Sequence, residues 1–336
     1  MLSALRSFPR IPWYRLLVRP FLFRLDPESA QRIADRALAA KPVWRLLAPV
    51  LPDTPLVASG IPLRNPIGLA AGLDKQCAYL DALGSLGFGY VVGGTVTLEP
   101  RPGNQRPRVR RIVHRKGLVN ALGFPSDGLE AVAARLERLE DRPARVLVSI
   151  AVLDEDGTET CWRRLEPSVD AIELNISSPN TAGLRRFQEP EALKGVLERL
   201  NGVRSKPLFV KLPPYMDERE RDNVLALARA CREAGISGIT AINTVPMDDS
   251  SMATGRGGLS GAPILAETLR ILPELRSEIG SDMVLNACGG ISSGNDAAQA
   301  LALGADTVQL FTALVYEGPG LVARIVSDLA RARGNS

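Results

Sequence analysis

The chain has 336 residues, a net charge of +4 and 45% hydrophobic residues. This composition argues against a disordered protein, and the length allows one large α/β domain or two ordinary ones. The basic residues form no long run, which argues against a nucleic-acid-binding arm. None of the cysteines forms a CxxC pair and His114 is the only histidine, so the sequence predicts no metal site, no disulfide framework and no Ser-His-Asp hydrolase.

The first 25 residues mix apolar and aromatic side chains with five arginines, Arg6, Arg10, Arg15, Arg19 and Arg24. No run of about 18 apolar residues exists, so no membrane-spanning helix is expected. The pattern fits a short helix lying in a membrane interface, although an Arg-rich targeting segment would look similar. Because it continues into Leu25-Asp26-Pro27, we expect a helical membrane-associating segment at 1–45 and a main domain at 46–336. The alternative is a helix that only packs on the main domain.

Short apolar strands and helical patterns alternate along the rest of the chain. The expected strands are 66–71, 89–94, 145–151, 170–176, 207–212, 237–242, 283–288 and 306–311. Helical patterns lie near 75–86, 126–140, 190–204, 217–234, 263–278, 293–303 and 319–333. This alternation predicts an α/β fold, a (β/α)8 TIM barrel rather than a doubly wound sheet. No GxGxxG motif follows a strand, which argues against a dinucleotide site.

Residues 171–185 carry the most informative pattern. An apolar strand ends at Asn175 and opens onto Ser178, Pro179 and Asn180. Asparagine both donates and accepts hydrogen bonds, which suits a small polar ligand, and a hydroxyl beside such a ligand can take a proton. A simple Ser/Pro/Asn turn at the end of a strand is the alternative.

Polar residues also follow the other expected strands, where a (β/α)8 barrel carries its chemistry. Lys211 ends an apolar strand, and burying it is costly unless it meets a negative group. A flavin ring that gains charge on reduction is one such partner, and a Schiff-base lysine is the rival interpretation. Gly289 and Gly290 after the seventh strand fit a phosphate site, or are ordinary loop glycines.

These residues together resemble the membrane-associated, quinone-dependent class of the dihydroorotate dehydrogenase family. The similarity runs from about Phe23 to Arg324 and includes motifs at 23–28, 65–75, 94–97, 102–104, 175–181, 257–261, 288–291 and 309–316. It implies an FMN-binding barrel that oxidises dihydroorotate to orotate in pyrimidine biosynthesis. It also implies a membrane quinone as acceptor and peripheral attachment to the cytoplasmic face of the cell membrane.

The resemblance further implies a role for individual residues. Ser178 is the expected catalytic base, and Arg111 is expected near the quinone. The expected substrate-binding residues are Lys75, Asn120, Gly123, Phe124, Asn175, Asn180, Asn243 and Thr244. The expected FMN-binding residues are Ala71, Gly72, Thr95, Ser149, Asn175, Lys211, Gly261, Gly290, Phe311 and Thr312. Neither a metal nor a nucleic acid is expected.

The chain also departs from the family pattern. Ser149 replaces an FMN-facing amide, and Val152 and Asp154 replace a basic pair. Further departures are Pro125, Ser126, Ile242, Ala287 and Phe311. Three hypotheses therefore stand: the family's enzyme, a diverged paralogue acting on another dihydropyrimidine-like cyclic amide, or an inactive barrel kept for binding. The retained amides, Ser178 and the two lysines favour the enzyme.

Overall fold

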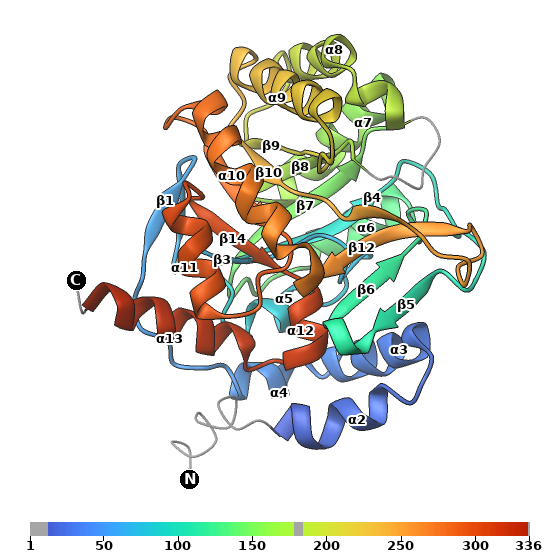
Figure 1. Ribbon diagram of the computed structural model, residues 1–336, viewed down its shortest axis with the longest axis vertical. Coiled ribbons are helices and arrows are strands. Elements are labelled where there is room, and N and C mark those ends of the chain that lie inside the picture. The colour runs from blue at the N-terminus through green and yellow to red at the C-terminus, as the bar shows by residue number, and fades with distance from the viewer. Residues whose placement is uncertain (1–12, 178–183, 335–336) are drawn as a thin grey trace.

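Eight parallel strands close into a barrel in the computed structural model, which describes residues 13–177 and 184–334 (Figure 1). The strands follow one another in chain order, and the last pairs with the first. The barrel predicted from the sequence is therefore confirmed. Its strands are β3 (Ile67–Leu69), β4 (Tyr90–Val96), β7 (Arg145–Ala151), β8 (Ala171–Asn175), β9 (Leu208–Lys211), β10 (Gly238–Ala241), β13 (Val284–Cys288) and β14 (Thr307–Leu310).

Helices cover the outside of the barrel (Figure 1). They are α5 (Leu80–Gly84), α6 (Leu129–Glu137), α7 (Glu155–Leu165), α8 (Pro190–Asn201), α9 (Glu218–Glu233), α10 (Leu265–Ile279), α11 (Gly294–Ala302), α12 (Thr312–Glu317) and α13 (Leu321–Gly334). The sequence pattern missed α7, whose first turn is polar and contains Gly157. Asp154 starts this helix by accepting a hydrogen bond from the Gly157 N–H at 2.6 Å.

The two faces of the strands explain where the apolar core ends. On β7, Val146, Val148 and Ile150 pack outward against the helices, whereas Leu147 belongs to a small cluster inside the barrel. That inner cluster closes the lower end of the barrel together with the hairpin of β1 (Leu56–Ala58) and β2 (Ile61–Leu63). Nearer the carboxyl ends of the strands the inner face becomes polar, beginning with the buried Ser149.

A second sheet stands beside the barrel and was not expected from the sequence. It is antiparallel, with the order β11 (Val245–Asp248), β12 (Arg256–Gly261), β6 (Gly117–Asn120), β5 (Val109–Ile112). Its strands come from the long connections after β4 and β10. They are short and rich in glycine and arginine, so they lack the apolar run by which the barrel strands were recognised.

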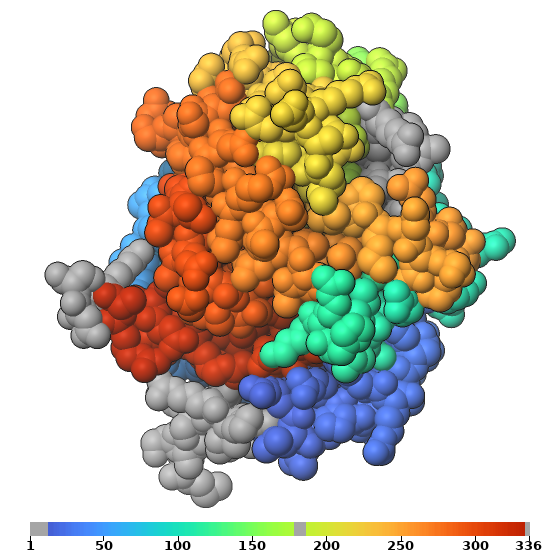
Figure 2. All heavy atoms as spheres, viewed as in Figure 1, coloured from blue at the N-terminus to red at the C-terminus, as the bar shows by residue number. Residues whose placement is uncertain are grey.

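The described part of the N-terminal segment is helical, as expected. A π-helical turn (Tyr14–Val18) leads into α2 (Arg19–Leu22), followed by α3 (Pro27–Leu38) and α4 (Lys41–Leu46). Figures 1 and 2 show this segment at one edge of the molecule, beside the second sheet and the C-terminal helices. Tyr14 donates to the Val315 carbonyl at 2.8 Å, so the segment packs on the barrel.

The same segment presents an N-terminal apolar set to the surface: Leu16, Leu17 and Phe21 are 68%, 72% and 57% exposed. Some side chains of the segment, such as Tyr14, therefore contact the barrel, while others, such as Leu16, are exposed to solvent. Within the described ranges, no helix has the length and apolar character needed to cross a bilayer. The domain boundary near residue 45 stays a prediction.

Candidate active site

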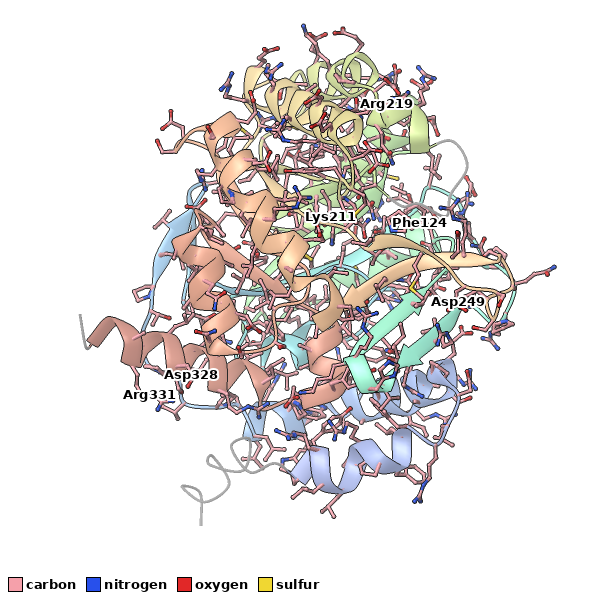
Figure 3. The ribbon with its side chains drawn as sticks, in the orientation of Figure 1. Phe124, Lys211, Arg219, Asp249, Asp328 and Arg331 are labelled. Carbon is pink, nitrogen blue, oxygen red and sulfur yellow. The ribbon has the colours of Figure 1, made fainter. Side chains whose placement is uncertain are left out.

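A cavity of about 580 Å³ opens at the carboxyl ends of the barrel strands. Its floor and walls come from loops after β3, β10, β13 and β14, from the second sheet and from α3. Figure 3 shows Lys211 near the middle of the molecule and Phe124 to one side of it. The volume lies within the range of about 300–1,000 Å³ that is typical of small-molecule and cofactor sites.

Most of the site residues predicted from the sequence line this one cavity. Ser149 is the exception among the described residues, since it lies buried behind Thr95. Ser178 and Asn180 fall outside the described residues, and their roles stay predictions. The residues brought together are Ala71, Gly72, Lys75, Thr95, Arg111, Asn120, Gly123, Phe124, Asn175, Lys211, Asn243, Thr244, Gly261, Gly290, Phe311 and Thr312.

A hydrogen-bond network orients the buried amides. Asn175 donates through Nδ2 to Thr95 Oγ1 at 3.1 Å, and the same oxygen lies 3.1 Å from Ser149 Oγ. Asn243 donates through Nδ2 to Ser177 Oγ at 2.8 Å, and the Ser177 N–H donates to Asn175 Oδ1 at 3.2 Å. Ser177 therefore links the two amides. The sequence pattern gave no reason to choose it, because only its neighbour Ser178 matched a catalytic motif.

Two lysines face the cavity from different strands. Lys75 follows β3, is half-buried and donates from Nζ to the Gly72 carbonyl at 2.6 Å. Burial lowers the pKa of Lys75, while Asp35 and Asp74 oppose that shift. Lys211 ends β9, is only 6% exposed and lies with Nζ 3.6 Å from Cys288 Sγ. The cavity can therefore offer positive charge to an anionic ligand at two points.

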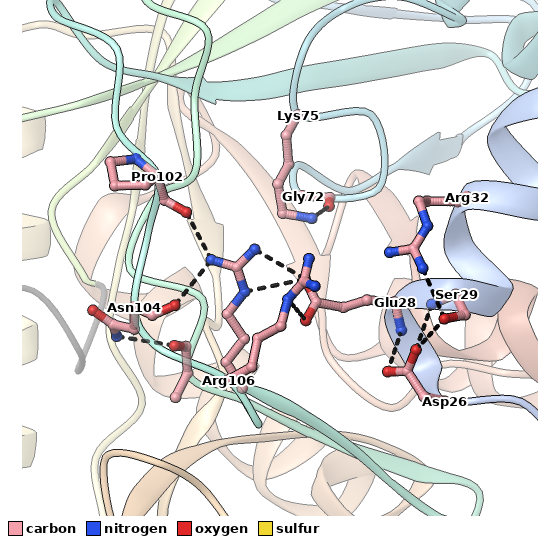
Figure 4. A network of polar contacts seen from close by, with 11 residues as sticks. Asp26, Glu28, Ser29, Arg32, Gly72, Lys75, Pro102, Asn104 and Arg106 are labelled. Carbon is pink, nitrogen blue, oxygen red and sulfur yellow. Dashed lines mark hydrogen bonds and ion pairs between the residues drawn. The ribbon is translucent and has the colours of Figure 1, made fainter.

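A charged network lines the cavity on the side of α3 (Figure 4). Glu28 at the start of α3 accepts from Arg108 at 2.9 and 3.1 Å and pairs with Arg106 at 2.8 Å. Arg108 also donates to the carbonyls of Pro102 and Asn104, at 2.7 and 3.0 Å. These contacts tie the N-terminal helices to the loop after β4. The sequence analysis missed them because they join residues about 80 positions apart.

Arg111 lies between the cavity and the N-terminal segment. It donates to the Leu25 carbonyl at 2.8 Å, and its guanidinium stacks 4.7 Å from the centre of the Phe23 ring. Phe23 in turn meets Tyr316 edge to face, with 5.2 Å between ring centres. Arg111 is therefore positioned by the same residues that anchor α2.

Several departures from the family pattern have structural roles in this chain. Asp154 caps α7, and Val152 is completely buried. Ser126 Oγ accepts from the Gly128 N–H at 3.2 Å, which fixes the turn before α6. Pro125 and Ile242, by contrast, line the cavity. The changed positions are thus divided between supporting turns and the site itself.

Backbone and side-chain features of the cavity suit a phosphate-bearing polar cofactor. Gly290 has φ +76°, and a Cβ there would lie 2.5 Å from the Leu265 backbone nitrogen. Gly261 has φ +88°, and a Cβ there would lie 2.4 Å from the Lys116 carbonyl. Only glycine fits at either position. Gln309 also lines the cavity with both amide atoms buried and unpartnered among the described residues, so a ligand can satisfy them.

Fold and cavity together define a (β/α)8 barrel with a polar cavity of small-molecule size at the carboxyl ends of its strands. The family model described as Dihydroorotate dehydrogenase matches residues 57–332. The chain therefore belongs to the dihydroorotate dehydrogenase family.

Individual relatives agree with this assignment. The chain is 38% identical to a dihydroorotate dehydrogenase (quinone) from Flavobacterium lutescens, covering 94% of this chain and 96% of the relative. It is 37% identical to the protein of the same name from Delftia acidovorans, covering 94% and 98%. Among solved structures, ligand-free DHODH from Eimeria tenella is similar with a TM-score of 0.81 and 27% identity, over 92% of this chain and 96% of that chain.

Proposed function

We propose that this protein oxidises dihydroorotate to orotate in pyrimidine biosynthesis and passes the electrons through FMN to a membrane quinone. The observation that carries the proposal is the convergence of Lys75, Asn120, Asn175 and Asn243 on one cavity in a chain of this family. Orotate offers a carboxylate and a ring of alternating N–H and carbonyl groups. An ammonium and several amides are the side chains that match both features.

FMN is the proposed cofactor, and bound FMN would supply a two-electron acceptor for hydride. Gly261 and Gly290 allow the close backbone approach that a phosphate needs, and Thr312 lies beside them in the lining. Lys211, Thr95 and Gln309 are the polar groups available to its ring system. The donor set therefore fits an anionic, hydrogen-bonding cofactor.

Ser178 is the proposed base that removes the C5 proton of dihydroorotate while hydride leaves C6. A serine hydroxyl is a weak base and needs a neighbour that receives its proton. Ser177, which precedes it, is hydrogen-bonded to Asn175 and Asn243 and holds both amides in fixed positions. A substrate ring bound between the two amides would be oriented for reaction because both amides are held in place.

The N-terminal segment 1–45 is the proposed membrane and quinone-access element. The N-terminal apolar set is exposed, and arginines flank it along the chain. This combination suits a peripheral helix on an anionic membrane surface, which on this proposal is the cytoplasmic face of the cell membrane. Arg111, between this segment and the cavity, is the proposed contact for the quinone.

The diverged paralogue remains the second candidate, because Pro125 and Ile242 line the cavity where the family pattern differs. A dihydropyrimidine without a carboxylate, such as dihydrouracil, separates the two proposals. The lead predicts orotate formation from dihydroorotate with ubiquinone as acceptor, and little reaction with dihydrouracil. The reverse preference would support the paralogue.

The catalytic assignment has its own test. Ser178→Ala should keep FMN bound and slow reduction of the flavin by dihydroorotate by roughly 10²–10⁴-fold, the usual contribution of a general base. Stopped-flow spectroscopy measures this rate directly. A near wild-type rate in the variant would remove Ser178 from the mechanism.

A further inference from the structure

A single acid, Glu173, lies inside the barrel below the cavity. It is the only acidic residue in the eight barrel strands, and its side chain is 1% exposed. On β8 it precedes Asn175 by two residues, so both side chains point to the same face of the strand. Asn175 lines the cavity, and Glu173 therefore lies one layer deeper. A carboxylate in this position is costly unless the interior stabilises its charge.

Four side chains form a hydrogen-bonded chain that ends on Glu173. Thr240 donates to Glu173 Oε2 at 2.7 Å, and Asn286 donates through Nδ2 to Thr240 Oγ1 at 3.2 Å. Thr307 donates to Asn286 Oδ1 at 2.6 Å, which uses its one hydrogen. Tyr90 must therefore be the donor in its 2.7 Å contact with Thr307. Every donor points toward Glu173, an arrangement that stabilises a carboxylate anion.

Lys211 is the one cation on β9, the strand that pairs with β8. In the register of the barrel it lies beside Asn175 on one side and beside Thr240, the donor to Glu173, on the other. Its Nζ contacts Cys288 Sγ, but burial raises the pKa of that thiol, which leaves it neutral. Desolvation lowers the pKa of Lys211, whereas the negative charge of Glu173 and the contact with Cys288 oppose that shift, so that the net direction is upward.

We propose that Glu173 and Lys211 form a buried charge pair, in which Glu173 is the positioning residue that keeps Lys211 an ammonium at the cavity floor. The second carboxylate oxygen, Oε1, is buried and has no hydrogen-bond partner in the described part of the chain. Glu173 and Lys211 are not in direct contact, so they interact as opposite charges across the barrel interior. The positive charge of Lys211 is then in place at the cavity floor before any ligand binds, and such preorganised charge stabilises negative charge that develops on a ligand. Its link to a flavin rests on the proposed function.

A double-mutant cycle tests the pair itself. Unfolding of the full-length protein, with and without added FMN, is compared for wild type, Glu173→Gln, Lys211→Met and the double variant. Each single change leaves one buried charge uncompensated and should lower the melting temperature. The double variant should lose clearly less than the sum of the two. Additive losses would overturn the proposal.

The chain offers a matched control for this cycle. Asp81 is a similarly buried acid, 4% exposed, but it pairs with Lys41 at 2.9 Å outside the barrel. Asp81→Asn should therefore add independently to Lys211→Met. If Glu173→Gln cannot be purified, Thr240→Val removes one donor to Glu173 and enters the same cycle under the same criterion.

The midpoint potential of bound flavin tests the functional consequence. Without Glu173 the buried Lys211 should lose its proton more readily, so Glu173→Gln should disfavour the anionic reduced flavin and shift the potential to more negative values. Lys211→Met should shift it to more negative values. An unchanged potential in Glu173→Gln would contradict the link to the cofactor. If no variant or wild-type protein binds flavin, the proposed function fails, whereas the unfolding cycle still decides whether the pair exists.

Discussion

Replacing Lys75 by Met tests how the cavity recognises an anionic substrate. Lys75 Nζ is anchored to the Gly72 carbonyl at 2.6 Å, which leaves two of its three N–H groups for a ligand. The side chain is half-buried, so a carboxylate bound there is shielded from much of the solvent. Methionine keeps the length and removes the charge, and the protein should fold normally.

The expected loss follows from the value of a hydrogen bond to a charged group, about 1.5–3 kcal/mol. At about 1.4 kcal/mol per factor of ten, the dissociation constant for orotate should rise roughly 10- to 150-fold. Calorimetric titration of orotate into the FMN-loaded protein measures this change. Lys194→Met is the matched control, because Lys194 is exposed on α8, away from the cavity lining, and should leave orotate binding unchanged.

The same titration predicts a pH dependence. Burial lowers the pKa of Lys75, so the ammonium loses its proton at a lower pH than an ordinary lysine. Orotate affinity should therefore fall as pH rises through that lowered pKa, and should stay flat over this range in Lys75→Met. Tight, pH-independent orotate binding in the variant would refute the assignment of Lys75 as the carboxylate contact.

Three further predictions concern other parts of the molecule. Ser149→Asn should slow FMN dissociation, because the second donor of the amide can reach a flavin atom that serine leaves unpaired. Equal dissociation rates for Ser149→Asn, Ser149→Ala and wild type would show that the position does not contact FMN. Changing the N-terminal apolar set to Gln should reduce vesicle binding and turnover with a long-chain quinone, but should spare reduction of a soluble dye. The control Val57→Gln, at a site 70% exposed on the β1–β2 hairpin, should change neither vesicle binding nor quinone turnover. Arg108→Leu should destabilise the protein by about 1–3 kcal/mol, since it removes the hydrogen bonds of Arg108 to Glu28 and to two carbonyls while Arg106 still pairs with Glu28. A loss below about 1 kcal/mol in urea unfolding would show that the network is dispensable.

The barrel could be predicted from sequence because each of its strands is buried on both faces. Such strands appear as continuous apolar runs between turn signals. The second sheet could not be found this way, since Arg256–Gly261 of β12 consists largely of glycine and polar residues. The helix α7 escaped for a similar reason, because its polar first turn hides the apolar stripe that begins at Cys161 and Trp162.

The same reason explains which residues of the candidate site could be predicted from the sequence and which could not. Residues such as Lys75 and Asn243 follow apolar strands directly, so strand order alone predicts that they meet. Ser177, Glu28 and Arg108 act through contacts made by the folded chain, and no local pattern marks them. Glu173 was visible as an acid within an apolar run, but the chain of donors that ends on it joins four other strands and appears only in three dimensions.

The most direct test of the proposed function is an anaerobic titration of the FMN-loaded protein with dihydroorotate. The visible flavin absorbance and the orotate formed are measured in the same sample. We expect the flavin band to bleach with one orotate released per flavin, and ubiquinone added afterwards to restore the band. A bound flavin that stays oxidised through excess dihydroorotate would contradict the proposed function.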